Sequence, residues 1–81
     1  MKIFNLTNGD VIVCNNANTR NGFKHVATLL RNGCEMYETK ICYLNRTWER
    51  FEYESVINKL LEDFYGDELK NPTLNIKLKE D

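Results

Sequence analysis

Two Asn-Gly pairs stand between β-rich runs, and they constrain the fold more than any other feature of this 81-residue sequence. Asn8-Gly9 joins KIFNLT to DVIVC, and Asn32-Gly33 joins FKHVATLLR to CEMYETKICYL. Asn-Gly suits a two-residue type I′ hairpin loop because both residues accept a positive φ. The first half of the chain is therefore predicted to form two antiparallel hairpins.

The loop length of the first hairpin determines which side chains share a face. If Asn8-Gly9 is the whole loop, Leu6 lies opposite Val11 and Phe4 lies opposite Val13. Side chains alternate along a strand, so these four then project from one side of the ribbon. The other side carries the less consistent set Ile3, Asn5, Ile12 and Cys14.

The second hairpin is predicted to have two mixed faces. One face collects Val26, Thr28 and Leu30 with Tyr37, Thr39 and Ile41. The other collects Phe23, His25, Ala27 and Leu29 with Met36, Glu38, Lys40 and Cys42. The charged residues and His25 predict that the second face is partly wet. The polar stretch NNANTRN, residues 15–21, is predicted to be the loop between the hairpins.

After residue 44 the apolar period changes from that of a strand to that of a helix. Tyr53, Ile57, Leu60, Leu61 and Phe64 recur at helical spacing, with Val56 beside them. Thr47 is the predicted N-cap, with Glu49 in the first turn, and Gly66 is predicted to end the helix.

A terminal strand is predicted where Leu74, Ile76 and Leu78 alternate with polar residues after Pro72. The predicted fold is a single α+β domain, residues 1–81, in the order β-β-β-β-α-β. It consists of a small antiparallel sheet with one helix packed on one face. Trp48 is predicted to be an aromatic anchor against the sheet.

Composition points to a cytoplasmic protein without cofactors. The chain has no apolar run long enough to span a membrane and no secretory signal pattern, and its three cysteines are an odd, sparse set. Cys14, His25, Cys34 and Cys42 lack the tight Cys-x2-Cys spacing of zinc sites, so no metal is predicted. No phosphate loop or catalytic motif is present, which predicts a protein that is not an enzyme.

Charge is segregated along the chain although the net charge is only −1. Residues 1–48 carry six Lys/Arg against three acids, whereas residues 49–68 carry seven acids against two cations. The acidic helix could face a basic protein. The cations of the hairpin region, with nearby aromatic side chains, offer the alternative of nucleic-acid binding. A third alternative is capture of a small anionic nucleotide by Arg20, Arg46 and the amides of residues 15–21.

The segments NGFKHVATLLRNG and KICYLNRTWERFEYESVINKLL resemble small uncharacterised proteins of Gram-positive bacteriophages and mobile elements. The resemblance covers roughly residues 20–61. It implies a short accessory protein that binds and modulates a host or phage protein, with inhibition of a host defence system, CRISPR included, as one such role. The candidate binding residues are Arg20, Lys24, Arg46, Trp48, Glu49, Arg50, Glu52 and Glu54. A homodimer could also form, through the open sheet face or the edge at residues 74–78.

Overall fold

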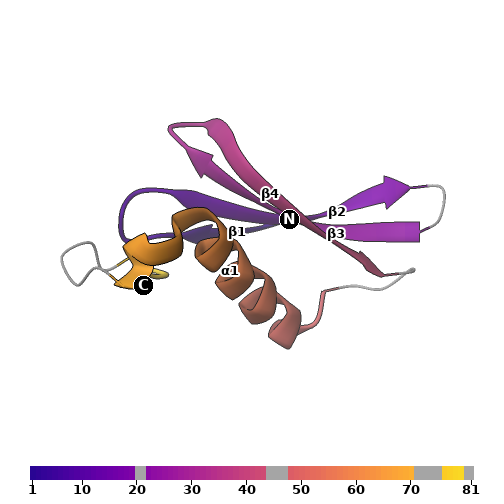
Figure 1. The fold of residues 1–81 in the computed structure, drawn as a ribbon. Coiled ribbons are helices and arrows are strands. Elements are labelled where there is room, and N and C mark those ends of the chain that lie inside the picture. The colour runs from indigo at the N-terminus through magenta and orange to yellow at the C-terminus, as the bar shows by residue number, and fades with distance from the viewer. Residues whose placement is uncertain (20–21, 44–47, 71–75, 80–81) are drawn as a thin grey trace.

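The computed structural model describes residues 1–19, 22–43, 48–70 and 76–79. Within these ranges, it describes the side chains of all residues except 17–19, 22–24 and 41–43. The chain forms an antiparallel meander with one helix on one face of the sheet (Figure 1). This confirms the predicted α+β class, with four antiparallel strands followed by one helix packed on the sheet; the predicted fifth strand is considered below. The elements in chain order are β1 (Lys2–Asn5), β2 (Val11–Thr19), β3 (Gly22–Arg31), β4 (Cys34–Tyr43), α1 (Arg50–Tyr65) and a 3₁₀ helix η1 (Gly66–Lys70).

The hairpin between β3 and β4 turns as predicted. Arg31 pairs with Cys34, which leaves Asn32 and Gly33 as a two-residue loop. Their φ angles are 53° and 80°. Positive φ at both central residues is the signature of a type I′ turn, whose twist matches that of the flanking strands.

The predicted loop and register of the first hairpin are wrong by one residue. The loop has three residues, because the Leu6 N–H donates a hydrogen bond to Asp10 O and the Leu6 carbonyl accepts one from the Gly9 N–H. Gly9 has φ +93°, which fits the glycine of a bulged three-residue loop. Phe4 therefore pairs with Ile12, not Val13. The slip moves Ile12 and Cys14 to the covered face and Val11 and Val13 to the other.

Strand β2 continues through much of the segment predicted as a loop. Residues 15–19 pair with residues 22–26, ending at Thr19 opposite Gly22. The predicted loop at residues 15–21 is therefore wrong for residues 15–19, and residues 20–21 lie outside the described chain. Polarity misled the prediction because Asn15 and Asn16 are exposed, and an exposed part of a strand has no need of apolar residues.

A bulge in β4 reverses the predicted pairing of faces in the second hairpin. Leu30 pairs with Glu35 but Leu29 pairs with Tyr37, so one extra residue, Met36, is accommodated in β4. Tyr37 and Thr39 consequently share the helix side with Ala27 and Leu29, and Glu38 and Lys40 move to the opposite face. The expectation of a wet His25 face is also wrong, because His25 is buried.

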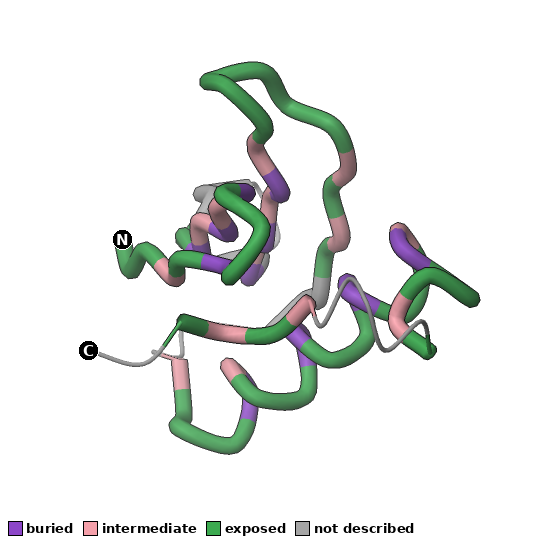
Figure 2. Tube along the Cα trace, turned by 90° about the vertical axis from the view of Figure 1, so that its left-hand side faces the viewer, coloured by how far each residue is buried: buried purple, intermediate pink, exposed green. Residues whose placement is uncertain are grey.

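The core lies between the sheet and α1. Figure 2 shows buried positions alternating with exposed ones along the strands and recurring along the helix. These are the two periods expected for a strand and a helix that are each buried on one side. The predicted helical stripe is confirmed at Val56, Ile57, Leu60 and Leu61, while Tyr53 and Phe64 are half-buried at its margin. From the sheet the core takes Leu6, Ile12, Cys14, Ala27 and Leu29.

The N-terminus of α1 differs from the prediction. Glu49, not Thr47, is the N-cap, and it forms a reciprocal capping box with Glu52. The Glu52 carboxylate accepts the Glu49 N–H at 2.9 Å. A capping box satisfies backbone donors that a helix start otherwise leaves unpaired. Gly66 ends the helix as predicted, and its N–H bonds to Glu62 O.

The predicted terminal strand is reduced to one bridge within the described residues. Leu78 bridges Leu6, and Lys79 donates to Asn5 O while Thr7 donates to Lys77 O. Residues 76–79 thus run along the outer side of the β1 end, and residues 71–75 of the prediction lie outside the described chain. No helix in the described segments is long and apolar enough to cross a membrane.

Candidate binding surface

One polar cluster, centred on the buried Asp10, fastens the first hairpin to the rest of the fold. Asp10 is 3% exposed and accepts hydrogen bonds from Arg31 Nε and Nη2, at 3.0 and 2.9 Å. It also accepts from the Tyr65 hydroxyl and from Asn8 Nδ2. The Arg31 guanidinium holds the pKa of the Asp10 carboxyl below its ordinary value, against the opposing effect of burial.

The same contacts act on Tyr65 at the end of α1. Burial, and then the hydrogen bond to the Asp10 carboxylate, raise the pKa of its phenol, so it stays protonated and donates. The cluster joins the loop after β1, the end of β3 and the last turn of α1. Because every strong partner in it is internal, its role is to hold these elements together rather than to bind a ligand.

A second buried cluster lies under the start of α1. The His25 ring stacks on Trp48 at 4.4 Å between centroids, and Trp48 stacks on Tyr53 at 4.8 Å. His25 Nδ1 lies 3.3 Å from Glu52 Oε2. The β3 histidine is thus enclosed by the junction before α1 and by its first turn. Glu52 has two structural tasks, since one oxygen caps the helix and the other faces His25.

Removing the Glu52 carboxylate should destabilise the fold. We expect Glu52→Ala to lower the free energy of unfolding by about 1–2 kcal/mol, because the capping bond is lost and the site is buried. Glu52→Gln retains an acceptor for the Glu49 N–H and should cost less. Urea unfolding of both variants measures the difference, and equal losses would contradict a capping role.

The described cysteines and histidine show no catalytic arrangement. Cys14 is buried, and its burial raises the thiol pKa to about 11, which makes it a poor nucleophile. Among the described residues, no group of three or more His, Cys, Asp or Glu side chains could hold a metal ion. Cys34 is exposed beside the second hairpin loop. The side chain of Cys42 is outside the described set.

The predicted site residues whose side chains the structure describes do not converge on one site. Trp48, Glu49 and Glu52 belong to the helix start and its aromatic stack, as described above. Arg50 and Glu54 are exposed on α1, beside Phe51, which is 61% exposed. No ion pair joins Arg50 to Glu49 or Glu54 in the described chain. The side chains of Arg20, Lys24 and Arg46 are outside the described set, so their predicted roles stay predictions.

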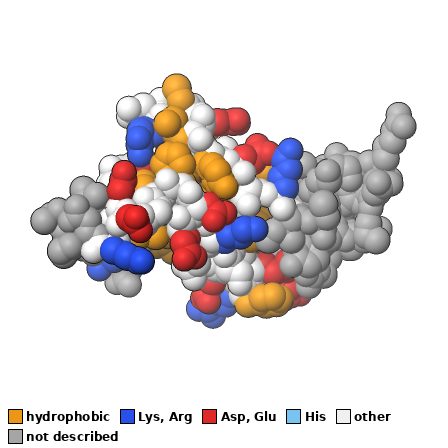
Figure 3. Space-filling view, in the orientation of Figure 1, with side chains coloured by type: hydrophobic (Ala, Val, Ile, Leu, Met, Phe, Trp, Pro, Cys, Tyr) orange, Lys and Arg blue, Asp and Glu red, His pale blue; other side chains and the backbone are white. Residues whose placement is uncertain are grey.

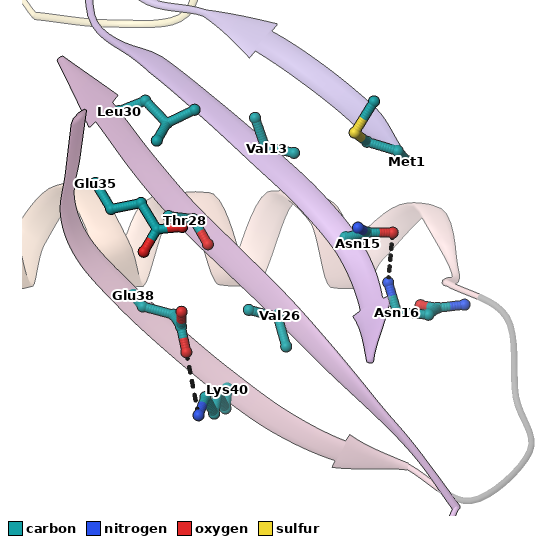
Figure 4. A pocket seen from close by; sticks show the side chains of 10 residues that line it. All are labelled: Met1, Val13, Asn15, Asn16, Val26, Thr28, Leu30, Glu35, Glu38 and Lys40. Carbon is teal, nitrogen blue, oxygen red and sulfur yellow. Dashed lines mark hydrogen bonds and ion pairs between the residues drawn. The ribbon is translucent and has the colours of Figure 1, made fainter. Parts of the chain in front are cut away.

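No described residue covers the face of the sheet opposite α1; the sequence predicted that this face could be open, but not which residues form it. It holds a shallow open groove of about 480 Å³, seen from close by in Figure 4. Its apolar centre consists of half-buried side chains from β2 and β3, with the exposed Met1 at one side. The ten lining residues are Met1, Val13, Asn15, Asn16, Val26, Thr28, Leu30, Glu35, Glu38 and Lys40.

Polarity changes across this face from β1 to β4. One row of paired positions runs Ile3, Val13, Thr28 and Glu38. A neighbouring row runs from Asn5 through Val11 and Leu30 to Glu35. The β1–β3 part of the surface is therefore mainly apolar, with uncharged polar residues among its members, and β4 provides a charged margin where Lys40 and Glu38 pair at 3.2 Å. We name the face formed by the groove residues other than Asn16, together with Ile3 and Val11, the open face.

Knowing which residues of each strand point to the same side of the sheet would have revealed the composition of the open face. The predicted two-residue loop placed Val11 and Val13 on one side with Phe4 and Leu6. The predicted regular β4 placed Glu38 and Lys40 with His25 and Leu29. Each error separated residues that share the open face. A one-residue shift exchanges the two faces of a strand, so the composition of neither face was visible.

The described part of the basic hairpin surface is neutralised internally. Arg31 is bound to Asp10, and Lys40 pairs with Glu38. Tyr37, one of the aromatic side chains near these cations, packs near Phe64 on the helix side. On the side of the molecule seen in Figure 3, acidic and basic side chains are interspersed. These contacts do not favour nucleic-acid binding by the hairpin surface over protein binding by the open face.

Comparison with protein-family models, curated proteins and solved structures finds no match for this chain. These comparisons therefore assign no function to the chain.

Proposed function

We propose that this chain is a non-enzymatic binding protein that docks a protein partner on its open face. The observation that supports the proposal is the groove of about 480 Å³ between half-buried Val13, Val26 and Leu30. Contiguous apolar surface with a polar margin is typical of protein interaction sites. The two buried polar clusters, by contrast, are accounted for by internal contacts.

The resemblance to small phage proteins directs the choice of partner. An accessory protein of that kind would act in the cytoplasm of a Gram-positive host, and a component of a host defence system is the first partner to test. Binding there would modulate the partner by occupying a surface that it needs. Nucleic-acid binding and nucleotide capture stay predictions, because Arg20, Lys24 and Arg46 have no described side chains.

The test distinguishes binding at the open face from binding at the acidic helix. Tagged wild-type protein is used to recover partners from a Gram-positive host lysate, and each partner identified is purified and titrated directly. Val13→Lys and Val26→Lys place a charge in the groove centre and should weaken binding roughly tenfold or more. Glu54→Lys, at an exposed position of α1, is the matched control and should bind like the wild type.

Circular dichroism of each variant confirms that folding is retained before binding is compared. If a partner loses affinity for Glu54→Lys but not for the groove variants, its binding site lies on the helix and not on the open face. Retained affinity in every variant would reject the open face as the docking surface.

A further inference from the structure

The outer edge of β4 is the longest unpaired edge in the described chain. In the strand order β1-β2-β3-β4, β4 pairs with β3 on one side only. The opposite edge strand, β1, is contacted on its outer side by residues 77–79. An unpaired strand offers a row of N–H and C=O groups that can pair with another strand.

The bulge divides β4 into two parts. The irregularity falls at Met36, between the pair Leu30 and Glu35 and the pair Leu29 and Tyr37. From Tyr37 to Tyr43 the pairing with β3 continues without another shift. Bulges twist a strand locally and disfavour edge pairing there. The regular part after Met36 is thus the segment suited to receive another strand.

We propose that β4 pairs with β4 of a second copy of this chain, antiparallel about a twofold axis at Thr39. In this register Glu38 lies directly opposite Lys40 of the second copy, and Lys40 lies opposite the second Glu38. Thr39 lies opposite its own counterpart. Opposite charges and threonine pairs are both favourable when directly opposed across antiparallel strands. The segment Tyr37-Glu38-Thr39-Lys40-Ile41 is therefore complementary to itself.

Charge selects this register over its neighbours. A twofold axis between antiparallel strands of one sheet passes through a pair of identical positions. An axis at position 38 would oppose two Glu38 side chains, and an axis at position 40 would oppose two Lys40 side chains. Like charges directly opposed are destabilising. Glu38 and Lys40 are both exposed and already lie on the same face of the sheet, so no refolding is needed.

The dimer has a defined architecture. The sheet becomes continuous through both copies, with the two α1 helices on one face and the two open faces on the other. The inference is independent of the proposed function, because the dimer forms without any other partner.

Exchanging the charges of Glu38 and Lys40 tests the proposed β4–β4 interface. Sedimentation equilibrium of the wild type, up to about 1 mM, should detect a dimer, since an edge-only interface is small and weak. Glu38→Lys and Lys40→Glu should each raise its dissociation constant roughly tenfold or more, because two attractive pairs become repulsive. The double variant exchanges both charges and should restore wild-type affinity. Glu54→Lys makes the same change of net charge as Glu38→Lys outside β4 and should have little effect.

A cross-link tests the register separately. Opposed Cα atoms in antiparallel strands are about 4.5–5.5 Å apart, within the span of a disulfide. Thr39→Cys, with Cys34 and Cys42 changed to serine, should form a covalent dimer on mild oxidation, and Glu35→Cys in the same background should not. A monomer at every concentration, or single charge variants that dimerise like the wild type, would overturn the proposal. So would a double variant that stays as weak as its parents.

Discussion

Leu60→Ala is expected to lower the free energy of unfolding by about 2–5 kcal/mol, the range for a buried leucine that leaves a cavity. Leu60 is fully buried at the centre of the contact between α1 and the sheet. A chain of this size has a total stability of about 4–12 kcal/mol, so the variant should be close to unfolding at room temperature. Urea or thermal unfolding followed by circular dichroism measures the loss.

Lys59→Ala is the matched control, because Lys59 precedes Leu60 on the same helix turn and its side chain is exposed. It should change the free energy of unfolding by less than about 0.5 kcal/mol. If Leu60→Ala were as stable as Lys59→Ala, the packing of α1 on the sheet would be contradicted.

Asp10→Asn is expected to cost roughly 3 kcal/mol at neutral pH, because the buried cluster loses its charge-assisted hydrogen bonds. The folded-state pKa of Asp10 is lowered, mainly by Arg31, relative to the ordinary value of 3.8. Its stabilising contribution is therefore complete above the unfolded-state pKa and is lost as the pH falls through the folded-state pKa. The difference between wild type and variant should shrink as the solution is acidified from about pH 5 to about pH 2.

Unfolding free energies measured along this pH series check the prediction. Asp67→Asn, an exposed carboxylate in η1, is the control and should leave the curve nearly unchanged. A difference between wild type and Asp10→Asn that stays constant with pH would show that the ionised carboxylate is not what stabilises the cluster.

Local sequence signals were sufficient to place four strands and the helix, though not for the length of β2 or for the terminal segment. Asn32-Gly33 determined a type I′ turn because few residue pairs accept positive φ twice. The apolar stripe from Val56 to Leu61 determined both the helix and its buried side, and Gly66 determined where the helix ends. Nothing comparable marked Asp10 as buried, because its partners Arg31 and Tyr65 are distant in the sequence and are brought to it only by folding.

The sequence by itself determined an antiparallel sheet, a covering helix and the approximate place of each, since turns and periodicity depend on neighbours along the chain. Only the tertiary structure decided which side of each strand is covered. The loop ending at Gly9 and the bulge at Met36 each add one residue, and each exchanges the faces of a strand. The extra residue at Gly9 places Asp10 where Arg31 and Tyr65 can satisfy it. The one at Met36 places Glu38 and Lys40 on the open face, where solvent can reach their charges.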